Sequence, residues 1–282
     1  MSAFKTPREI CLFVSELGIK KASSSSPVLV ALGVLAGAFI AFAAEGSNMA
    51  AFNLLADPST YGMGRCLAGV VFPTGLMLVL LAGGELFTGN TLMAISLARK
   101  KITLGGMVRN WTLVYLGNFL GSILVAHMMV GSGLFGSGAN MLGGVTIKIA
   151  SGKVSLSFLS AFYLGILCNW LVCLAVWICF GAMDMAGKIL GIFCPIWLFI
   201  TSGFEHSVAN MYYIPAGIMA KANAAWATAS GLSPEKLDAL TWGAFVVNNL
   251  VPVTLGNIVG GAVFVGLAYW YACLGAEERC GA

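Results

Sequence analysis

The sequence predicts an all-α integral membrane protein with six transmembrane helices in two inverted three-helix repeats, helices 2 and 5 being broken. Three observations lead to this prediction. Of the 282 residues, 59% are hydrophobic and 9% are charged, so a water-facing chain would expose long apolar runs. These runs form six stretches of membrane-crossing length. Two of the six are too long for one straight crossing and carry ionisable residues near their centres.

Each of the six stretches contains about 20 or more mostly apolar residues, enough to cross roughly 30 Å of hydrocarbon. They cover residues 27–45, 66–98, 110–134, 155–181, 189–220 and 244–274. We therefore expect three parts in the chain. These are an amphipathic cytoplasmic segment over 1–26, a six-helix transmembrane domain over 27–274 and a cytoplasmic tail over 275–282.

The basic residues predict the direction of the crossings, because Lys and Arg favour the cytoplasmic side. With the N-terminus inside, most of the fifteen basic residues fall on that side: Lys5, Arg8, Lys20, Lys21, Arg99, Lys100, Lys101, Arg109, Lys188 and Arg279. We expect both termini in the cytoplasm and the protein in the inner (plasma) membrane, surrounded by lipid. No nucleic-acid partner is expected, because the basic residues form no continuous face.

The second and fifth stretches are expected to be interrupted. As a single helix, the stretch 66–98 would be about 50 Å long, well beyond the bilayer core. It carries Glu85 near its middle, and the fifth stretch carries Glu205 and His206, with glycines beside both. Charge at mid-membrane depth and non-helical backbone are tolerated where they line a cavity. These two crossings are therefore the predicted pore elements.

A short internal repeat supports two inverted halves. Gly-Glu-Leu-Phe-Thr-Gly-Asn at 84–90 aligns with Phe-Glu-His-Ser-Val-Ala-Asn at 204–210, matching Glu to Glu and Asn to Asn. Leu-Gly-Asn-Phe-Leu-Gly at 116–121 is similarly matched by Leu-Gly-Asn-Ile-Val-Gly at 255–260. Because three crossings reverse the starting side, the halves must have opposite orientation.

His206 is the main functional candidate, as an ionisable residue in a broken span. A histidine at this depth can either exchange a proton or offset a negative charge, and the sequence leaves both readings open. Glu205 and Glu85 are expected to support the loop backbone. No cofactor and no metal are expected, because the chain has two histidines and its eight cysteines show no CxxC spacing.

The two signature segments, 84–89 and 203–211, resemble those of the formate/nitrite transporter family. The likeness continues through Leu-Gly-Ile-Leu-Cys-Asn at 164–169 and Asn-Leu-Val-Pro-Val-Thr-Leu-Gly-Asn at 249–257. It implies an aquaporin-like protomer, a homopentamer with one pore per subunit, and passage of formate, nitrite, hydrosulfide, lactate or similar ions. It also implies a set of substrate-binding or pore residues, with Glu205 and Glu85 in support. The set is His206, Thr88, Lys153, Asn169, Phe87, Phe199, Leu86, Leu76 and Phe72.

Within this set, the resemblance places Leu86 in the pore loop and assigns a constriction to Phe87 and Phe199. It assigns a bond with the central histidine to Thr88 and anion attraction to Lys153. Ordinary packing remains the alternative for the apolar members. We expect a channel or transporter for a small monovalent weak-acid anion, formate first, with permeation that depends on pH, and no enzyme. The alternatives are a nitrite or hydrosulfide channel of the same family and, more distantly, an aquaporin-like neutral-solute channel.

Overall fold

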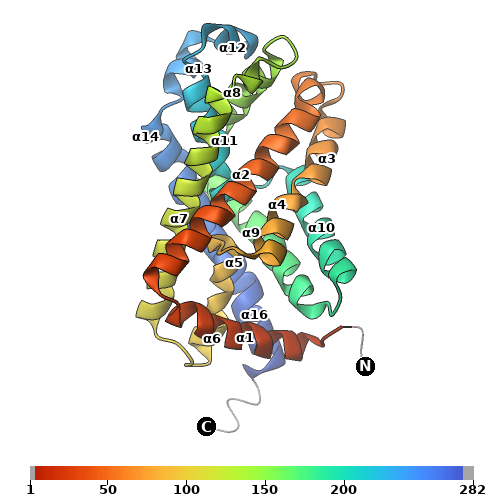
Figure 1. The fold of residues 1–282 in the computed structure, drawn as a ribbon, viewed down its shortest axis with the longest axis vertical. Helices are drawn as coiled ribbons and strands as arrows, with labels where there is room; N and C mark the ends of the chain where they lie inside the picture. The colour runs from red at the N-terminus through yellow and green to blue at the C-terminus, as the bar shows by residue number, and fades with distance from the viewer. Residues whose placement is uncertain (1–3, 276–282) are drawn as a thin grey trace.

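The computed structural model describes residues 4–275 and consists almost entirely of helices. Six helical segments are long and apolar enough to cross a membrane, which confirms the predicted number (Figure 1). They are Ser26–Ala56, Tyr61–Gly83, Leu104–Gly131, Phe158–Gly181, Met185–Ser202 and Trp242–Cys273.

The second and fifth crossings are broken, as predicted. The second begins with α3 (Tyr61–Val71), α4 (Pro73–Met77) and the π-helical η1 (Leu78–Gly83), and continues after the break as α5 (Phe87–Asn90), η2 (Thr91–Met93) and α6 (Ala94–Ala98). The fifth comprises α10 (Met185–Ser202) and α11 (Ser207–Ala220). Gly83 and Gly203 end the first parts with φ of 104° and 81°. In this left-handed region glycine has no side-chain clash, so the chain can leave the helix there.

The first crossing, α2 (Ser26–Ala56), runs well past the predicted limit at residue 45. That limit is wrong because Glu45 is accommodated inside the helix: the hydroxyl of Tyr212 donates a hydrogen bond to its carboxylate. A charged residue is tolerated within an apolar helix when it has a partner inside the protein.

Each half of the bundle contains one close contact between two helix backbones. α2 crosses α7 (Leu104–Gly131), where a Cβ on Gly37 would lie 2.1 Å from the carbonyl oxygen of Asn118. α9 (Phe158–Gly181) crosses α15 (Val251–Ile258), where a Cβ on Gly256 would lie 2.2 Å from that of Phe162. Only glycine permits such backbone approach.

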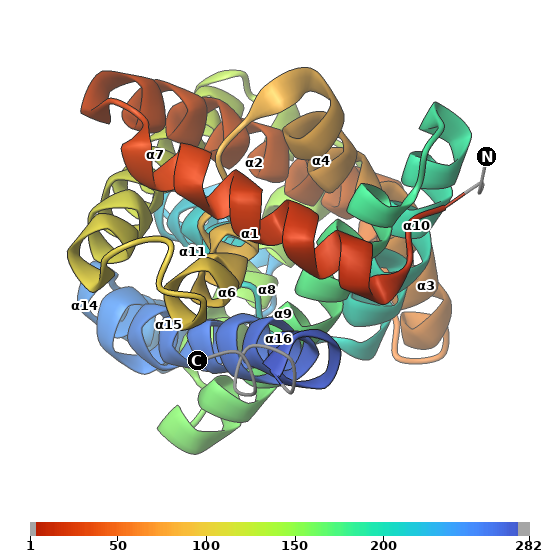
Figure 2. The ribbon, with the colours of Figure 1, turned by 90° about the horizontal axis from the view of Figure 1, so that it is seen from below.

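Shorter elements cover the two ends of the bundle. α1 (Pro7–Ser23) lies across one end (Figures 1 and 2), beside α16 (Ala268–Cys273). The other end carries elements that include a helix over 141–154, which the sequence did not predict: η3 (Leu134–Gly136), α8 (Met141–Val154), α12 (Ala224–Ala229) and α13 (Pro234–Ala239). The sixth crossing is built from α14 (Trp242–Ala244), η4 (Phe245–Leu250), α15, η5 (Val259–Leu267) and α16, with η4 and η5 π-helical.

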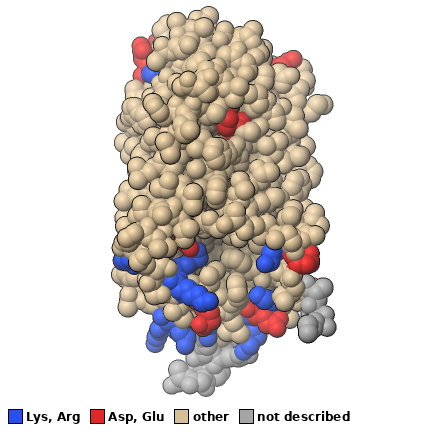
Figure 3. Space-filling model, in the orientation of Figure 1, with Lys and Arg blue, Asp and Glu red and all other residues tan. Residues whose placement is uncertain are grey.

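Charge is confined mainly to the two ends of the molecule. In Figure 3, Lys and Arg gather at the end crossed by α1, and a broad uncharged surface lies above them. This end is the one predicted to be cytoplasmic. The predicted parts 1–26 and 275–282 extend beyond the described residues, so residues 1–3 and 276–282 of those predictions lie outside them.

Candidate functional site

The two broken crossings meet through one polar contact. Oγ1 of Thr88, in α5, lies 2.9 Å from Nε2 of His206, the residue that immediately precedes α11. Both side chains are buried. The contact joins residues 118 positions apart. It lies where α5, after the break in the second crossing, faces the start of α11, after the break in the fifth.

The other ring nitrogen of His206 caps a helix. The backbone N–H of Ala209 donates to Nδ1 at 3.0 Å, in the geometry of a helix N-cap. Because Nδ1 accepts a hydrogen bond, the neutral ring carries its proton on Nε2 and directs it toward Thr88. The histidine therefore caps the first turn of α11 through Nδ1 and contacts the other half of the protein through Nε2.

Two asparagines hold the interrupted backbone in equivalent ways. Oδ1 of Asn118 accepts from the N–H of Phe87 at 2.9 Å, and Oδ1 of Asn257 accepts from that of Ser207 at 2.9 Å. The amide of Asn118 donates to Gly33 and Glu85 carbonyls. The amide of Asn257 does the same for Gly165 and Glu205. This correspondence, residue for residue, confirms the predicted inverted repeat.

The carboxylate of Glu205 is the centre of a buried polar cluster. Its Oε1 accepts from Lys153 Nζ at 2.7 Å, and its Oε2 accepts from the amides of Asn210 and Asn249 at 2.7 and 3.1 Å. The amide of Asn249 also donates to the carbonyl of Lys153 at 3.0 Å. We expected Glu205 to bond the loop backbone; instead its carboxylate binds side chains, because Lys153 and both asparagines converge on it.

The other half repeats this cluster around Glu85. Lys21 Nζ donates to Glu85 at 2.7 Å, as does the amide of Asn90, which also donates to Asn110 at 2.8 Å. The amide of Asn110 donates to the carbonyl of Lys21 at 3.1 Å. Lys21 of α1 thus corresponds to Lys153 of α8, so the repeat includes these two helices. Here too the predicted backbone role of the glutamate is wrong, and the sequence reasoning missed Lys21.

Two cavities approach the Thr88–His206 contact from opposite ends. The cavity on the α8 side, called the outer cavity, has about 60 Å³ and is lined by His206, Phe199, Glu205 and Lys153, among others. The cavity on the α1 side, called the inner cavity, has about 40 Å³ and is lined by Leu76, Leu86, Lys21 and neighbours. The predicted residues His206, Lys153 and Phe199 therefore share one cavity, and Leu76 and Leu86 share the other.

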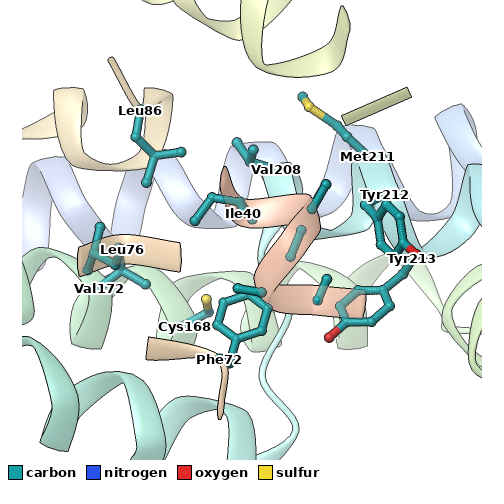
Figure 4. Close-up of a cluster of buried hydrophobic side chains, with 14 of the residues drawn as sticks. Ile40, Phe72, Leu76, Leu86, Cys168, Val172, Val208, Met211, Tyr212 and Tyr213 are labelled. Carbon is teal, nitrogen blue, oxygen red and sulfur yellow. The ribbon is translucent and has the colours of Figure 1, made fainter. Parts of the chain in front are cut away.

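Apolar side chains fill the region between the cavities. The rings of Phe72 and Phe199 meet edge-on with centroids 5.6 Å apart, and Phe199 lies 6.0 Å from the His206 ring. In Figure 4, Phe72 and Leu76 follow one another along one segment, beside Cys168 and Val172 of α9. All these side chains are buried.

Phe87 and Asn169 lie apart from this row. Phe87 packs edge-on against Trp111 and Tyr115, with ring centroids 6.0 and 4.9 Å away, and lines a separate groove between α7 and α15. The amide of Asn169 donates to the carbonyl oxygens of Thr88 and Asn257 at 3.2 and 2.6 Å. Asn169 therefore links the second crossing, through Thr88, to the sixth crossing, through Asn257.

Six crossings, two of them broken and joined by a polar contact between two cavities, define a multi-pass membrane channel or transporter. The chain belongs to the formate/nitrite transporter family, because the family model described as "Formate/nitrite transporter" matches residues 8–271.

Individual relatives are similar over nearly the whole chain. The chain is 41% identical over 273 residues to "Formate channel BtFdhC" of Bacillus thuringiensis, covering 96% of each chain. It is 38% identical over 287 residues to "Probable formate transporter" of Methanothermobacter thermautotrophicus, covering 97% of this chain and 98% of the relative. A solved structure, "Pentameric formate channel with formate bound", matches with a TM-score of 0.79 at 38% identity, covering 88% of this chain and 98% of its own.

Proposed function

We propose that the protein is a homopentameric formate channel in the cytoplasmic membrane, with one conduction path through each protomer. The observation that supports this most directly is the Thr88–His206 contact between an outer and an inner cavity. The path then runs from one cavity past the histidine to the other. The assembly and the substrate follow from the relatives, whose names specify formate and, for the solved structure, a pentamer.

The apolar row explains why a weak acid suits this path. A bare anion between Phe72, Leu76 and Phe199 would lose its hydration without a charged partner, whereas the neutral acid has a much smaller desolvation cost. His206 is the one titratable side chain that we place on the path at this depth. We assign it proton exchange with the anion, so that the species in the apolar row is neutral. Such exchange makes the flux depend on pH.

The remaining site residues divide into two roles. Phe72, Leu76, Leu86 and Phe199 limit the width of the path and exclude water from it. Lys153, Glu205, Thr88 and Asn169 hold His206 and the loops in place. Phe87, whose ring packs against Trp111 and Tyr115, shapes the loop that carries Thr88.

The basic residues support the proposed orientation. α1 and α16 lie at one end of the molecule (Figure 1), where Lys and Arg gather (Figure 3), and the positive-inside rule favours placing this end in the cytoplasm. Lys153 and the outer cavity then face the opposite side.

A competition series in proteoliposomes tests the substrate. We expect labelled formate to enter liposomes that contain the purified protein, with unlabelled formate competing best among formate, nitrite, hydrosulfide, lactate and acetate. Empty liposomes provide the background. Passage of glycerol without passage of formate, nitrite or hydrosulfide would instead establish a neutral-solute channel, and nitrite or hydrosulfide as the best competitor would move the assignment within the family.

A further inference from the structure

The outer cavity has two cationic residues in its lining, Lys153 and Arg65, and they differ in whether a carboxylate pairs with them. Both side chains line this cavity. Lys153 is paired with Glu205 at 2.7 Å, and their side chains are 16% and 6% exposed. A pair at this distance attracts a third charge only weakly, because its two fields largely cancel. For Arg65, by contrast, no carboxylate lies within ion-pair distance in the described part of the chain.

Arg65 also retains unused hydrogen-bonding capacity. It stands on α3 and donates one hydrogen bond through Nη2, to the carbonyl of Ile200 near the end of α10. No other hydrogen bond involves its side chain within residues 4–275. A guanidinium has five N–H donors in a rigid plane, so the greater part of this fork remains free, half-buried beside a cavity of about 60 Å³.

A second polar group in the same wall lacks a partner. Asn48, on α2, lines the outer cavity and is 2% exposed. Its Nδ2 has no hydrogen-bond partner among the described residues. A buried amide N–H without a partner is destabilising, so the position is unfavourable unless something else occupies that donor. Rotation of the amide about its last bond can present either end to the cavity.

We propose that Arg65 and Asn48 form an oxyanion subsite in the outer cavity that selects planar anions with two oxygen atoms, of the carboxylate type, over hydrosulfide. A guanidinium fork matches the two oxygens of such an ion with two parallel hydrogen bonds. Hydrosulfide has a single heavy atom and can use the charge but not the fork. This inference rests on the proposed transport function and specifies the substrate class of the same path.

The alternative is that Arg65 only binds the end of α10, where a cation interacts favourably with the last carbonyl groups. That role uses one N–H and a positive charge, both of which a lysine supplies. Arg65→Lys therefore separates the two roles, because it keeps the charge and a donor for Ile200 but removes the planar fork.

The experiment measures how much unlabelled formate, nitrite or hydrosulfide halves the uptake of labelled formate into proteoliposomes. In the wild type we expect formate and nitrite to compete better than hydrosulfide. Arg65→Lys should reduce this preference about tenfold, the effect of one lost hydrogen bond to a charged group. Asn48→Leu, which has a similar volume, should reduce it less. Lys148→Met removes one positive charge from the exposed side of α8, outside the cavity lining, and should leave it unchanged.

Each result has a definite meaning. An unchanged preference in both Arg65→Lys and Asn48→Leu overturns the subsite. If Arg65→Lys does not assemble as a pentamer in gel filtration, Asn48→Leu decides alone by the same criterion. Absence of labelled formate uptake in the wild type refutes the proposed function instead, and this outcome is independent of any Arg65 variant.

Discussion

The Lys153–Glu205 pair provides a quantitative test of how the outer cluster stabilises the protein. We consider Lys153→Met and Glu205→Gln, alone and combined. Both replacements have nearly the volume of the original side chain, and Gln keeps an acceptor oxygen for the amides of Asn210 and Asn249. The two single variants each leave one charge without its partner, whereas the double variant leaves none.

The expected magnitudes follow from burial. Removing one member of a fully buried ion pair costs roughly 3–5 kcal/mol, because the other charge stays buried and unpaired. Lys153 and Glu205 are 16% and 6% exposed and both line the outer cavity, so water can partly solvate whichever charge remains. Each single variant should therefore lower the free energy of unfolding by about 2–3 kcal/mol. The double variant should lower the free energy of unfolding by less than the sum of the two single effects. The Lys21–Glu85 pair, with 18% and 14% exposure, should give the smaller coupling.

Thermal unfolding of the detergent-solubilised protein, at one protein concentration, measures these differences. Each single variant should lower the midpoint by about 5 °C for a chain of this size, and the double variant should recover part of that loss. The equivalent Lys21→Met and Glu85→Gln cycle serves as the matched comparison. Strict additivity in the outer cycle, or a larger coupling in the inner one, would refute the argument from burial.

Three further predictions concern the helix contacts and the central histidine. Gly256→Ala should prevent monodisperse assembly in gel filtration, because its Cβ would lie 2.2 Å from a backbone oxygen, whereas Gly105→Ala, with nothing within 4 Å, should elute normally; normal elution of both would contradict the close contact. Asn257→Leu should lower the unfolding midpoint by leaving the N–H of Ser207 without its partner, and an unaltered midpoint would argue against that role. His206→Phe should remove the pH-dependent part of formate uptake, with His206→Asn as the variant that keeps a cap for α11; an unaltered pH profile in both would leave the histidine a structural role only.

The crossings and their interruptions could be predicted because they depend on local properties. Apolar length, the position of Glu85 and Glu205, and the adjacent glycines are all visible within one stretch of chain. The end of α2 could not be predicted in this way. Its continuation past Glu45 depends on Tyr212, 167 residues away, and no local pattern reveals such a partner.

The candidate site could be predicted in part, because some of its residues lie in local sequence patterns. His206 was identified as an ionisable residue in a broken span, and Thr88 and Lys153 were identified by resemblance, whereas Lys21 was missed because its partner Glu85 is 64 residues distant. A signal did exist: Lys21 precedes Gly33 by as many residues as Lys153 precedes Gly165. Arg65 and Asn48 show no such signal, because their shared cavity is formed only when α2, α3 and α10 pack together.

The cap on α11 has a consequence for how the path can operate. Nδ1 of His206 has one lone pair, and the N–H of Ala209 occupies it. A second proton on the ring must take that lone pair, so the imidazolium can form only if the first turn of α11 moves away. Each protonation of His206 would then require a small movement of the first turn of α11, and a path with a rigid wall could not allow it.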